Sequence, residues 1–238
     1  MTEEICFLAA HNDEQARLRI YRPANSRGSA CVLINSGRVA RFDEDEDESK
    51  LYQALHYALC ERGITTFEID LPERDRSEPD STEKAVEDRL LRLRCLLDEP
   101  AFLPFHYDYS VVALSLGGQV MLRQLAGPEG RPAPGTVVLI GTVVEAPVIV
   151  VDSVRKIHLV YGENDCVGYL EPQSEYVRFQ RPVVYGQRSR ERLVVRRSQH
   201  VSCHILKGCG HTLSRVDPGC DDPLNALVSF LLPVAGFA

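Results

Sequence analysis

Three side chains in the sequence have the chemistry needed for nucleophilic catalysis: Ser115, Asp165 and His211. A serine hydroxyl is a weak nucleophile at neutral pH and needs a base that accepts its proton. A histidine can serve as that base, and a carboxylate beside it can hold the imidazole in the required tautomer. Each of the three follows a short apolar run, so the elements that position them decide whether they meet.

The apolar runs predict a sheet whose strand ends carry these residues. Strands are predicted at 30–35, 65–70, 109–114, 136–140, 157–161 and 202–206, with a hairpin at 5–10 and 16–21. Helices are predicted at 49–62, 81–97, 119–125 and from 222 onward. Strands that alternate with helices indicate a mostly parallel sheet with helices on both faces. Ligands bind at the carboxyl ends of the strands in such sheets, which is where the three residues fall.

Three motifs resemble those of the α/β-hydrolase superfamily. The run Ala113-Leu114-Ser115-Leu116-Gly117 resembles its nucleophile elbow, a sharp strand–turn–helix connection. Residues 162–167 (Gly-Glu-Asn-Asp-Cys-Val) are similar to its acid motif, and residues 208–213 (Gly-Cys-Gly-His-Thr-Leu) to its histidine loop. The resemblance runs from about residue 30 to the C-terminus and has the Ser, Asp, His order of this fold. It implies one α/β-hydrolase domain over 1–238, with little or no lid because the interval from Ser115 to Asp165 is short.

The resemblance also assigns roles. Ser115 is the expected nucleophile, His211 the base and Asp165 the residue that orients the base, with Asp152 a weaker rival for that acid role. The N–H of Leu116 is the expected first oxyanion donor. The second is expected from Gly37 or Arg38, in the loop after the first buried strand. Two positions depart from the family pattern: Ala113 replaces the first glycine of the elbow, and Ser36 stands where many relatives have histidine.

Two charged segments bear on the substrate. Residues 169–200 form an Arg-rich insertion near the predicted site, and Arg188, Arg190 and Arg192 are candidates to contact an anionic group such as a coenzyme A or phosphopantetheine phosphate. The alternative is a solvated or salt-bridged surface. The acidic run Asp43–Glu48 is interpreted as helix N-terminal acids in a solvated loop, with attraction of a cationic substrate or pairing with those arginines as alternatives.

Composition excludes several partners and sites. The formal charge of −7 argues against a nucleic-acid binder, and the apolar region 136–151 is broken by Glu145 and Pro147, so no membrane span is expected. Cysteines and histidines near 203–211 lack a second pair at zinc spacing, so no metal site is expected. No phosphate loop or nucleotide fingerprint occurs, and no cofactor is expected. Eight scattered cysteines without an export signal indicate a cytoplasmic protein.

These features predict a serine hydrolase that cleaves an ester or thioester through an acyl-enzyme, with acyl thioesters slightly favoured by the arginines. The expected partner is a small-molecule or carrier-bound acyl substrate. The alternatives are an amidase or peptidase of the same fold, in which the acidic run recognises an amine, and a non-hydrolytic protein that keeps the fold.

Overall fold

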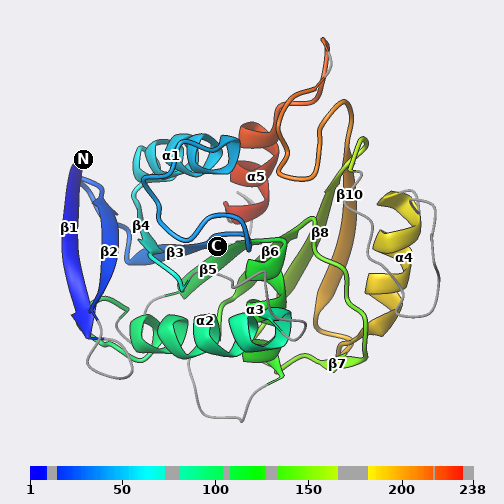
Figure 1. Cartoon of the computed structure of the whole chain (residues 1–238), viewed down its shortest axis with the longest axis horizontal. Helices are drawn as coiled ribbons and strands as arrows, with labels where there is room; N and C mark the ends of the chain where they lie inside the picture. The colour runs from blue at the N-terminus through cyan, green and yellow to red at the C-terminus, as the bar shows by residue number, and fades with distance from the viewer. Residues whose placement is uncertain are drawn as a thin grey trace.

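A mostly parallel sheet forms the centre of the molecule (Figure 1). The computed structural model describes residues 1–9, 15–72, 81–103, 108–126, 133–165, 182–216 and 218–232. Eight of the strands in these ranges form one sheet in the order β1-β2-β4-β3-β5-β6-β8-β10. Their bounds are β1 Thr2–Ala9, β2 Gln15–Arg22, β3 Ser29–Ile34, β4 Ile64–Ile69, β5 Asp108–Leu114, β6 Thr136–Ile140, β8 Lys156–Gly162 and β10 His200–Leu206.

Strand direction follows the sequence pattern. The hairpin β1–β2 is antiparallel and joins the sheet antiparallel to β4. From β4 through β3, β5, β6 and β8 to β10 all pairs are parallel. The central strands β3, β5 and β6 are buried along almost their whole length, which explains why they read as continuous apolar runs. The predicted parallel sheet and its hairpin are therefore confirmed, with the turn at 10–14 outside the described residues.

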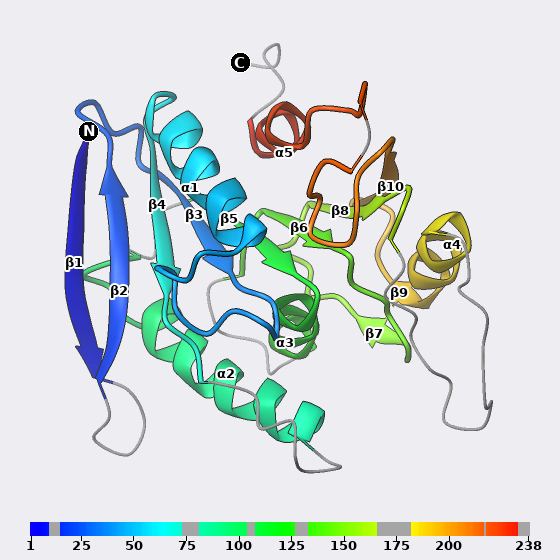
Figure 2. The ribbon, with the colours of Figure 1, turned by 45° about the horizontal axis from the view of Figure 1, so that its top comes forward.

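Helices cover both faces of the sheet (Figures 1 and 2). One face carries α1 (Asp47–Cys60) and α5 (Pro223–Leu231), which contact each other. The other face carries α2 (Ser81–Leu97) and α3 (Leu116–Leu125). Each pair of helices packs a hydrophobic core of its own against β3 and β5, one on each face of the sheet. The Asp-Pro pair predicted to start the last helix does so, because Asp222 accepts a hydrogen bond from the Leu224 N–H at 3.1 Å.

Part of the structure was not predicted from the sequence. Helix α4 (Pro182–Arg192) packs against β8 and β10, and two short strands, β7 (Val148–Ile149) and β9 (Leu193–Val194), pair in parallel beside it. Helix α4 and β9 fall within the predicted Arg-rich insertion 169–200, of which 169–181 lies outside the described residues. Between β6 and β8 the chain forms only β7 and its loops, so no lid domain arises from that connection. No helix in the described ranges is both long and apolar enough to cross a membrane.

Candidate active site

Ser115 occupies a strained turn between β5 and α3. Its backbone has φ 53° and ψ −111°, a left-handed φ that non-glycine residues rarely adopt. The turn is held because the Ser115 N–H donates to the Ile140 carbonyl at 2.7 Å and the Ser115 carbonyl accepts from the Gly118 N–H at 3.0 Å. Although Ser115 stands at the N-cap position of α3, its hydroxyl makes no capping hydrogen bond. A serine held under strain without a capping role is better explained by function than by turn formation.

The two glycines after this turn bring α3 close to the neighbouring strands. A Cβ atom on Gly117 would lie 2.6 Å from the Asn35 carbonyl oxygen and 2.7 Å from that of Ile34. A Cβ atom on Gly118 would overlap the side chain of Thr142. Gly-Gly therefore allows the first turn of α3 to pass between the loops that follow β3 and β6.

His211 and the buried Asp165 form a pair in the loops that follow β10 and β8. The His211 Nδ1 lies 3.0 Å from both carboxylate oxygens of Asp165, whose side chain is 2% exposed. Donation from Nδ1 to the carboxylate leaves Nε2 as the acceptor in the neutral imidazole. The rival acid, Asp152, instead pairs with Arg196 on the surface. Of the two candidates, the structure joins Asp165 to the histidine.

A tight loop presents His211. The Gly210 N–H donates to the Ser214 carbonyl at 2.9 Å, and the Gly208 N–H donates to the Glu163 carboxylate at 3.0 Å. A Cβ atom on Gly141 would lie 2.7 Å from His211 Cε1, so the backbone after β6 supports the ring directly. The imidazole is therefore fixed by its own loop, by Asp165 and by the neighbouring strand end.

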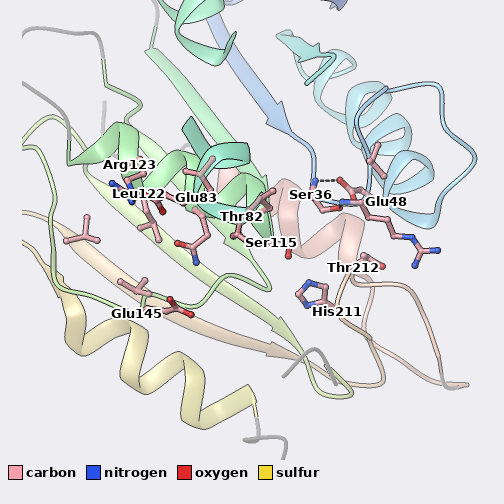
Figure 3. Close-up of a pocket in the computed structure, with 18 of the residues that line it drawn as sticks. Ser36, Glu48, Thr82, Glu83, Ser115, Leu122, Arg123, Glu145, His211 and Thr212 are labelled. Carbon is pink, nitrogen blue, oxygen red and sulfur yellow. Dashed lines mark hydrogen bonds and ion pairs between the residues drawn. The ribbon is translucent and has the colours of Figure 1, made fainter. Parts of the chain in front are cut away.

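Ser115 and His211 line the same cavity, which has a volume of about 1220 Å³. Figure 3 places the Ser115 hydroxyl beside the His211 ring at the centre of this cavity. Both residues are half-buried, so a ligand in the cavity can reach them. The structure thus brings the residues predicted as nucleophile, base and orienting acid together at the carboxyl-end side of β5, β10 and β8.

Backbone N–H groups for an oxyanion come from two segments. Among the described residues, neither the Leu116 nor the Gly37 N–H donates to another protein group. A Cβ atom on Gly37 would lie 2.9 Å from Leu116 Cδ2, so the two segments are in contact. The Arg38 N–H donates to the Ser36 hydroxyl at 3.1 Å. The geometry therefore favours Leu116 and Gly37 over Arg38, whose N–H already has a partner.

The sequence analysis missed a buried arginine that holds this loop. Arg89 of α2 is fully buried, and its Nη1 donates to the carbonyls of Ser36 and Asn35. Its Nη2 lies 3.4 Å from the Val39 carbonyl, and its Nε donates to the Pro72 carbonyl at 3.0 Å. An arginine on the apolar face of an amphipathic helix was the available signal, because charged residues are rarely fully buried without partners.

A carboxylate holds the other side of the same loop. Glu48 is buried in the first turn of α1, and its Oε1 accepts the Ser36 N–H at 2.6 Å. Burial raises the pKa of Glu48 to about 7, against the opposing effect of the Ser36 hydrogen bond. The Ser36 backbone is thus bound at its N–H by Glu48 and at its carbonyl by Arg89, and this carbonyl shares a peptide group with the Gly37 N–H.

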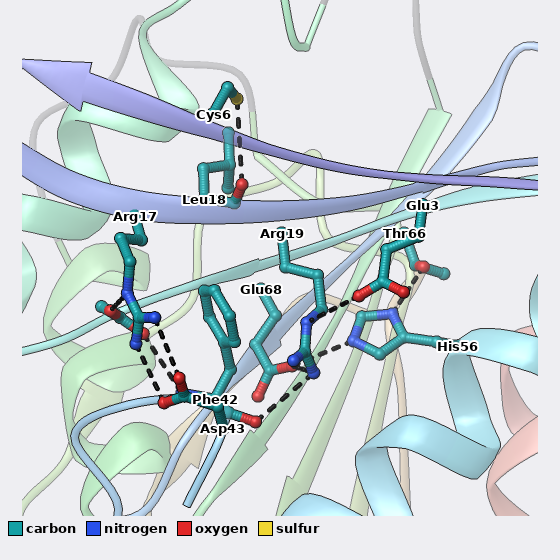
Figure 4. A network of polar contacts seen from close by, with 11 residues as sticks. Glu3, Cys6, Arg17, Leu18, Arg19, Phe42, Asp43, His56, Thr66 and Glu68 are labelled. Atoms are coloured by element: carbon teal, nitrogen blue, oxygen red, sulfur yellow. Dashed lines mark hydrogen bonds and ion pairs between the residues drawn. The ribbon is translucent and has the colours of Figure 1, made fainter.

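The rest of the acidic run makes local pairs. Asp47 lies in the first turn of α1 beside Glu48, as interpreted, but Glu48 is not solvated. The other acidic residues pair locally: Asp43 with Arg17, Asp45 with Lys50 and Glu46 with Arg38, while Glu44 accepts the N–H groups of Ala40 and Arg41. Figure 4 shows the Arg17–Asp43 pair, with Arg19 over the Phe42 ring and near the buried His56–Glu68 pair. Asp43 therefore ties the run to β2 of the hairpin, whereas Asp45, Glu46 and Glu44 bind groups within or next to the run.

The structure does not bring the three predicted substrate arginines to Ser115. None of the described residues that line the cavity is Arg188, Arg190 or Arg192. Arg188 and Arg190 are exposed on α4, and the Arg192 guanidinium donates to the Val144 carbonyl at 3.0 Å. Since Val144 lines the cavity, Arg192 supports its wall from behind.

The cysteines and histidines near the C-terminus point in different directions. Cys203 lies against Gly186 of α4, whereas the His204 ring packs against Phe230 of α5, because successive residues of β10 face opposite sides of the sheet. His211 pairs with Asp165 instead. These side chains do not converge on one point.

Comparison with solved structures identifies the fold. The chain matches an α/β serine hydrolase homologue from Coxiella burnetii with a TM-score of 0.62 and 14% identity, covering 97% of this chain and 96% of that one. A lidless α/β serine hydrolase from Xanthomonas campestris matches with a TM-score of 0.59 and 16% identity, covering 97% and 92%. The protein adopts the α/β-hydrolase fold. A dienelactone hydrolase from Anabaena variabilis has the same fold, with a TM-score of 0.60, 15% identity, and 96% and 94% covered.

At sequence level the likeness is weaker. No family model matches this α/β-hydrolase-fold chain, and no curated protein matches its sequence. The assignment of the fold therefore rests on the arrangement of strands and helices. The function of the site has to be argued from the geometry of the site itself.

Proposed function

We propose that the protein is a serine hydrolase that cleaves an ester or thioester bond through an acyl-enzyme. The observation that carries the proposal is the position of Ser115. Its backbone is strained, its hydroxyl does not cap α3, and it lines the same cavity as His211, which pairs with Asp165. Such strain persists only where the surroundings hold it, and it is commonest at reacting residues.

The residues have defined roles in this reaction. The Ser115 hydroxyl oxygen attacks the substrate carbonyl carbon while His211 Nε2 accepts its proton, and Asp165 stabilises the resulting imidazolium. The N–H groups of Leu116 and Gly37 donate to the developing oxyanion, where one such donor is typically worth about 3 kcal/mol of barrier. His211 then protonates the leaving alcohol or thiol. A water molecule, deprotonated by His211, attacks the acyl-enzyme and releases the acid.

The substrate is a small-molecule or carrier-bound acyl compound, and neither nucleic acid nor membrane is a proposed partner. Esters are supported by the solved structures of this fold, which include a dienelactone hydrolase and an esterase domain from Rhodothermus marinus. Thioesters stay in the proposal, but their preference rested on arginines that lie away from Ser115. A cytoplasmic location stays part of the proposal, supported by the eight scattered cysteines of the sequence.

The test is a substrate panel assayed with wild type and Ser115→Ala. We expect the wild type to hydrolyse p-nitrophenyl esters or acyl-coenzyme A thioesters, and Ser115→Ala to lose at least 10³-fold in kcat while keeping its circular dichroism spectrum. Amino-acid p-nitroanilides report the amidase alternative. Equal rates for wild type and Ser115→Ala would overturn the proposal.

A further inference from the structure

Strand β1 forms an open edge of the central sheet. Among the residues that the structure describes, β1 pairs with β2 only, and this pairing runs without a bulge from Thr2 opposite Arg22 to Ala9 opposite Gln15. Figures 1 and 2 show β1 at the border of the molecule, with no described helix or strand beyond it. In an antiparallel pair, alternate residues point their N–H and C=O groups away from the neighbouring strand. The outer side of β1 therefore offers backbone donors and acceptors to a further strand.

The sequence of β1 lacks the features that usually protect an edge strand. Its eight residues, Thr-Glu-Glu-Ile-Cys-Phe-Leu-Ala, include no proline, glycine or lysine. Proline, lysine and bulges are common means by which proteins prevent a further strand from pairing with an edge. The strand is also longer than the five or six residues of a typical strand. These properties favour pairing with another strand.

Two large apolar side chains on this strand are exposed. Ile5 is 51% exposed and Phe7 is 62% exposed, and the alternation of side chains along a strand places both on one face. Cys6 and Leu8 point to the opposite face, where they pack against the core that includes α2. A strand paired with the outer side of β1 can therefore cover Ile5 and Phe7 with side chains of its own.

The two acidic residues of β1 are already paired within the hairpin. Glu3 lies 3.4 Å from the Nε atom of Arg19, and Glu4 lies 3.2 Å from that of Arg22. Both acids also lie in the first half of the strand. An antiparallel pair of β1 strands therefore keeps the acids of one copy away from those of the other, whereas an in-register parallel pair sets them side by side.

We propose that β1 pairs antiparallel with β1 of a second copy of this chain, so that the two central sheets become one continuous sheet about a two-fold axis. The strand sequence favours the register in which Cys6 faces Cys6 of the second copy. Ile5 of each copy then faces Phe7 of the other, and Glu4 faces Leu8. The two Glu4 residues are about 14 Å apart along the strands in this register, farther than the Debye length of about 8 Å at physiological salt.

A second copy suits this edge better than an unrelated extended peptide does. The two-fold axis makes the interface self-complementary, because each contact between Ile5 and Phe7 occurs twice. The same pairing removes the open β1 edge of both copies at once, so that the assembly closes as a dimer and does not continue into a fibre.

Sedimentation velocity of the full chain between about 1 and about 200 µM measures this association. We expect the wild type to shift from monomer to dimer across that range. Phe7→Lys places a charge opposite Ile5 of the second copy and should weaken dimerisation at least tenfold. Ile149→Lys is the matched control, because Ile149 is also an exposed apolar strand residue but lies outside the central sheet. It should dimerise as the wild type does.

Hydrogen exchange of residues 1–9, followed by mass spectrometry at both ends of that concentration range, locates the interface. In the wild type and in Ile149→Lys we expect slower exchange of this segment at high concentration, because the outward N–H groups of β1 become hydrogen-bonded. In Phe7→Lys the exchange should not depend on concentration. Circular dichroism checks that each variant is folded, and Ile5→Lys replaces Phe7→Lys, with the same expected results, if Phe7→Lys does not fold.

The results either support this dimer or overturn it. A wild type that stays monomeric over the whole range overturns it. A dimer whose β1 exchange does not change with concentration uses another surface and also overturns it. Equal weakening by Phe7→Lys and Ile149→Lys, or no weakening by Phe7→Lys, has the same meaning. Concentration-dependent protection of β1 that is lost in Phe7→Lys and kept in Ile149→Lys supports the proposal.

Discussion

At the scale of single residues, the backbone of Ser36 is held at both its N–H and its carbonyl. Glu48 accepts its N–H, and the fully buried Arg89 donates to its carbonyl. Gly37, whose N–H is the second proposed oxyanion donor, is the next residue in the chain. Glu48 and Arg89 touch no reacting atom in the proposed mechanism, so they act as positioning residues for the donor.

The first residue-scale prediction concerns Arg89. Arg89→Lys keeps the positive charge but lacks the planar fork that reaches several carbonyls at once. We expect kcat for an ester to fall roughly 10- to 100-fold, less than the effect of losing a donor outright, with KM changed less than threefold. Arg92→Lys on the same helix is the control and should retain wild-type kcat. An Arg89→Lys protein with wild-type kcat would show that the clamp does not position the donor.

The second prediction concerns the pH dependence that Glu48 gives to stability. Because burial raises its pKa to about 7 from 4.5, the folded state holds the proton more tightly than the unfolded state between these values. Stability from Glu48 is therefore present below pH 4.5 and is lost as the pH rises through 7, by up to about 3 kcal/mol.

Urea unfolding at pH 5 and pH 8 measures this effect as the difference between wild type and Glu48→Gln. We expect Glu48→Gln to lose less stability than the wild type between the two pH values. Burial lowers the pKa of His158 to about 4, but His158 titrates in both proteins and cancels in the difference. Glu46→Gln, at an exposed pair with Arg38, should behave as the wild type. Parallel pH curves for wild type and Glu48→Gln would contradict the assignment.

At the scale of elements, the junction of β5 and α3 depends on close approach to the loop after β6. Gly118 touches the side chain of Thr142, whose hydroxyl donates to the carbonyls of Ser115 at 3.2 Å and Ile140 at 3.1 Å. A larger residue at 118 therefore displaces the loop after β6, which holds the turn at Ser115.

A double-mutant cycle tests this contact. Gly118→Ala should lower the free energy of unfolding by about 1–3 kcal/mol because the added methyl overpacks the junction. Thr142→Ala alone should cost about 1 kcal/mol for its lost hydrogen bonds. Combined, the two changes should cost less than their sum, since the second removes most of the atoms that the first meets. Strict additivity would mean that the two residues do not contact each other in solution.

The elements that the sequence predicted are those with a strong local period. The apolar run Val137–Ile140 predicts a strand and the amphipathic pattern of 81–97 predicts a helix. The structure has β6 and α2 at these positions. Helix α4 was missed because it contains Gly186 and three arginines near its C-terminal end. Neither feature is typical of a helix that packs against a sheet. Strands β7 and β9 have two residues each, too short for any period to appear.

The residues of the candidate site also differ in whether the sequence could predict them. The grouping of Ser115, Asp165 and His211 was predictable because each of them occupies a local motif that follows a strand. Arg89 and Glu48 were not, because their partners are the backbone groups of a loop far away in the sequence. The three arginines of α4 were misplaced for the complementary reason: their charge is visible in the sequence, but the direction in which α4 presents them is set by tertiary packing.

At the scale of the whole molecule, the residues of the candidate site lie along one edge of the central sheet. The loops after β3, β5, β6, β8 and β10 all contribute to the site, and parallel pairing brings their ends to the same edge. The hairpin β1–β2 extends the far side of the sheet, where Arg17 of β2 binds Asp43 of the acidic segment and Asp70 after β4. The α/β-hydrolase fold thus presents Ser115 at this edge, and our central claim is that Ser115 is the nucleophile.

The most direct test of that claim is intact-mass analysis of wild type and Ser115→Ala after treatment with a fluorophosphonate. An activated serine displaces fluoride and becomes phosphonylated, whereas an ordinary serine does not react. We predict a single adduct on the wild type and none on Ser115→Ala. No adduct on folded wild type, or the same adduct on both proteins, would contradict the assignment of Ser115 as the nucleophile.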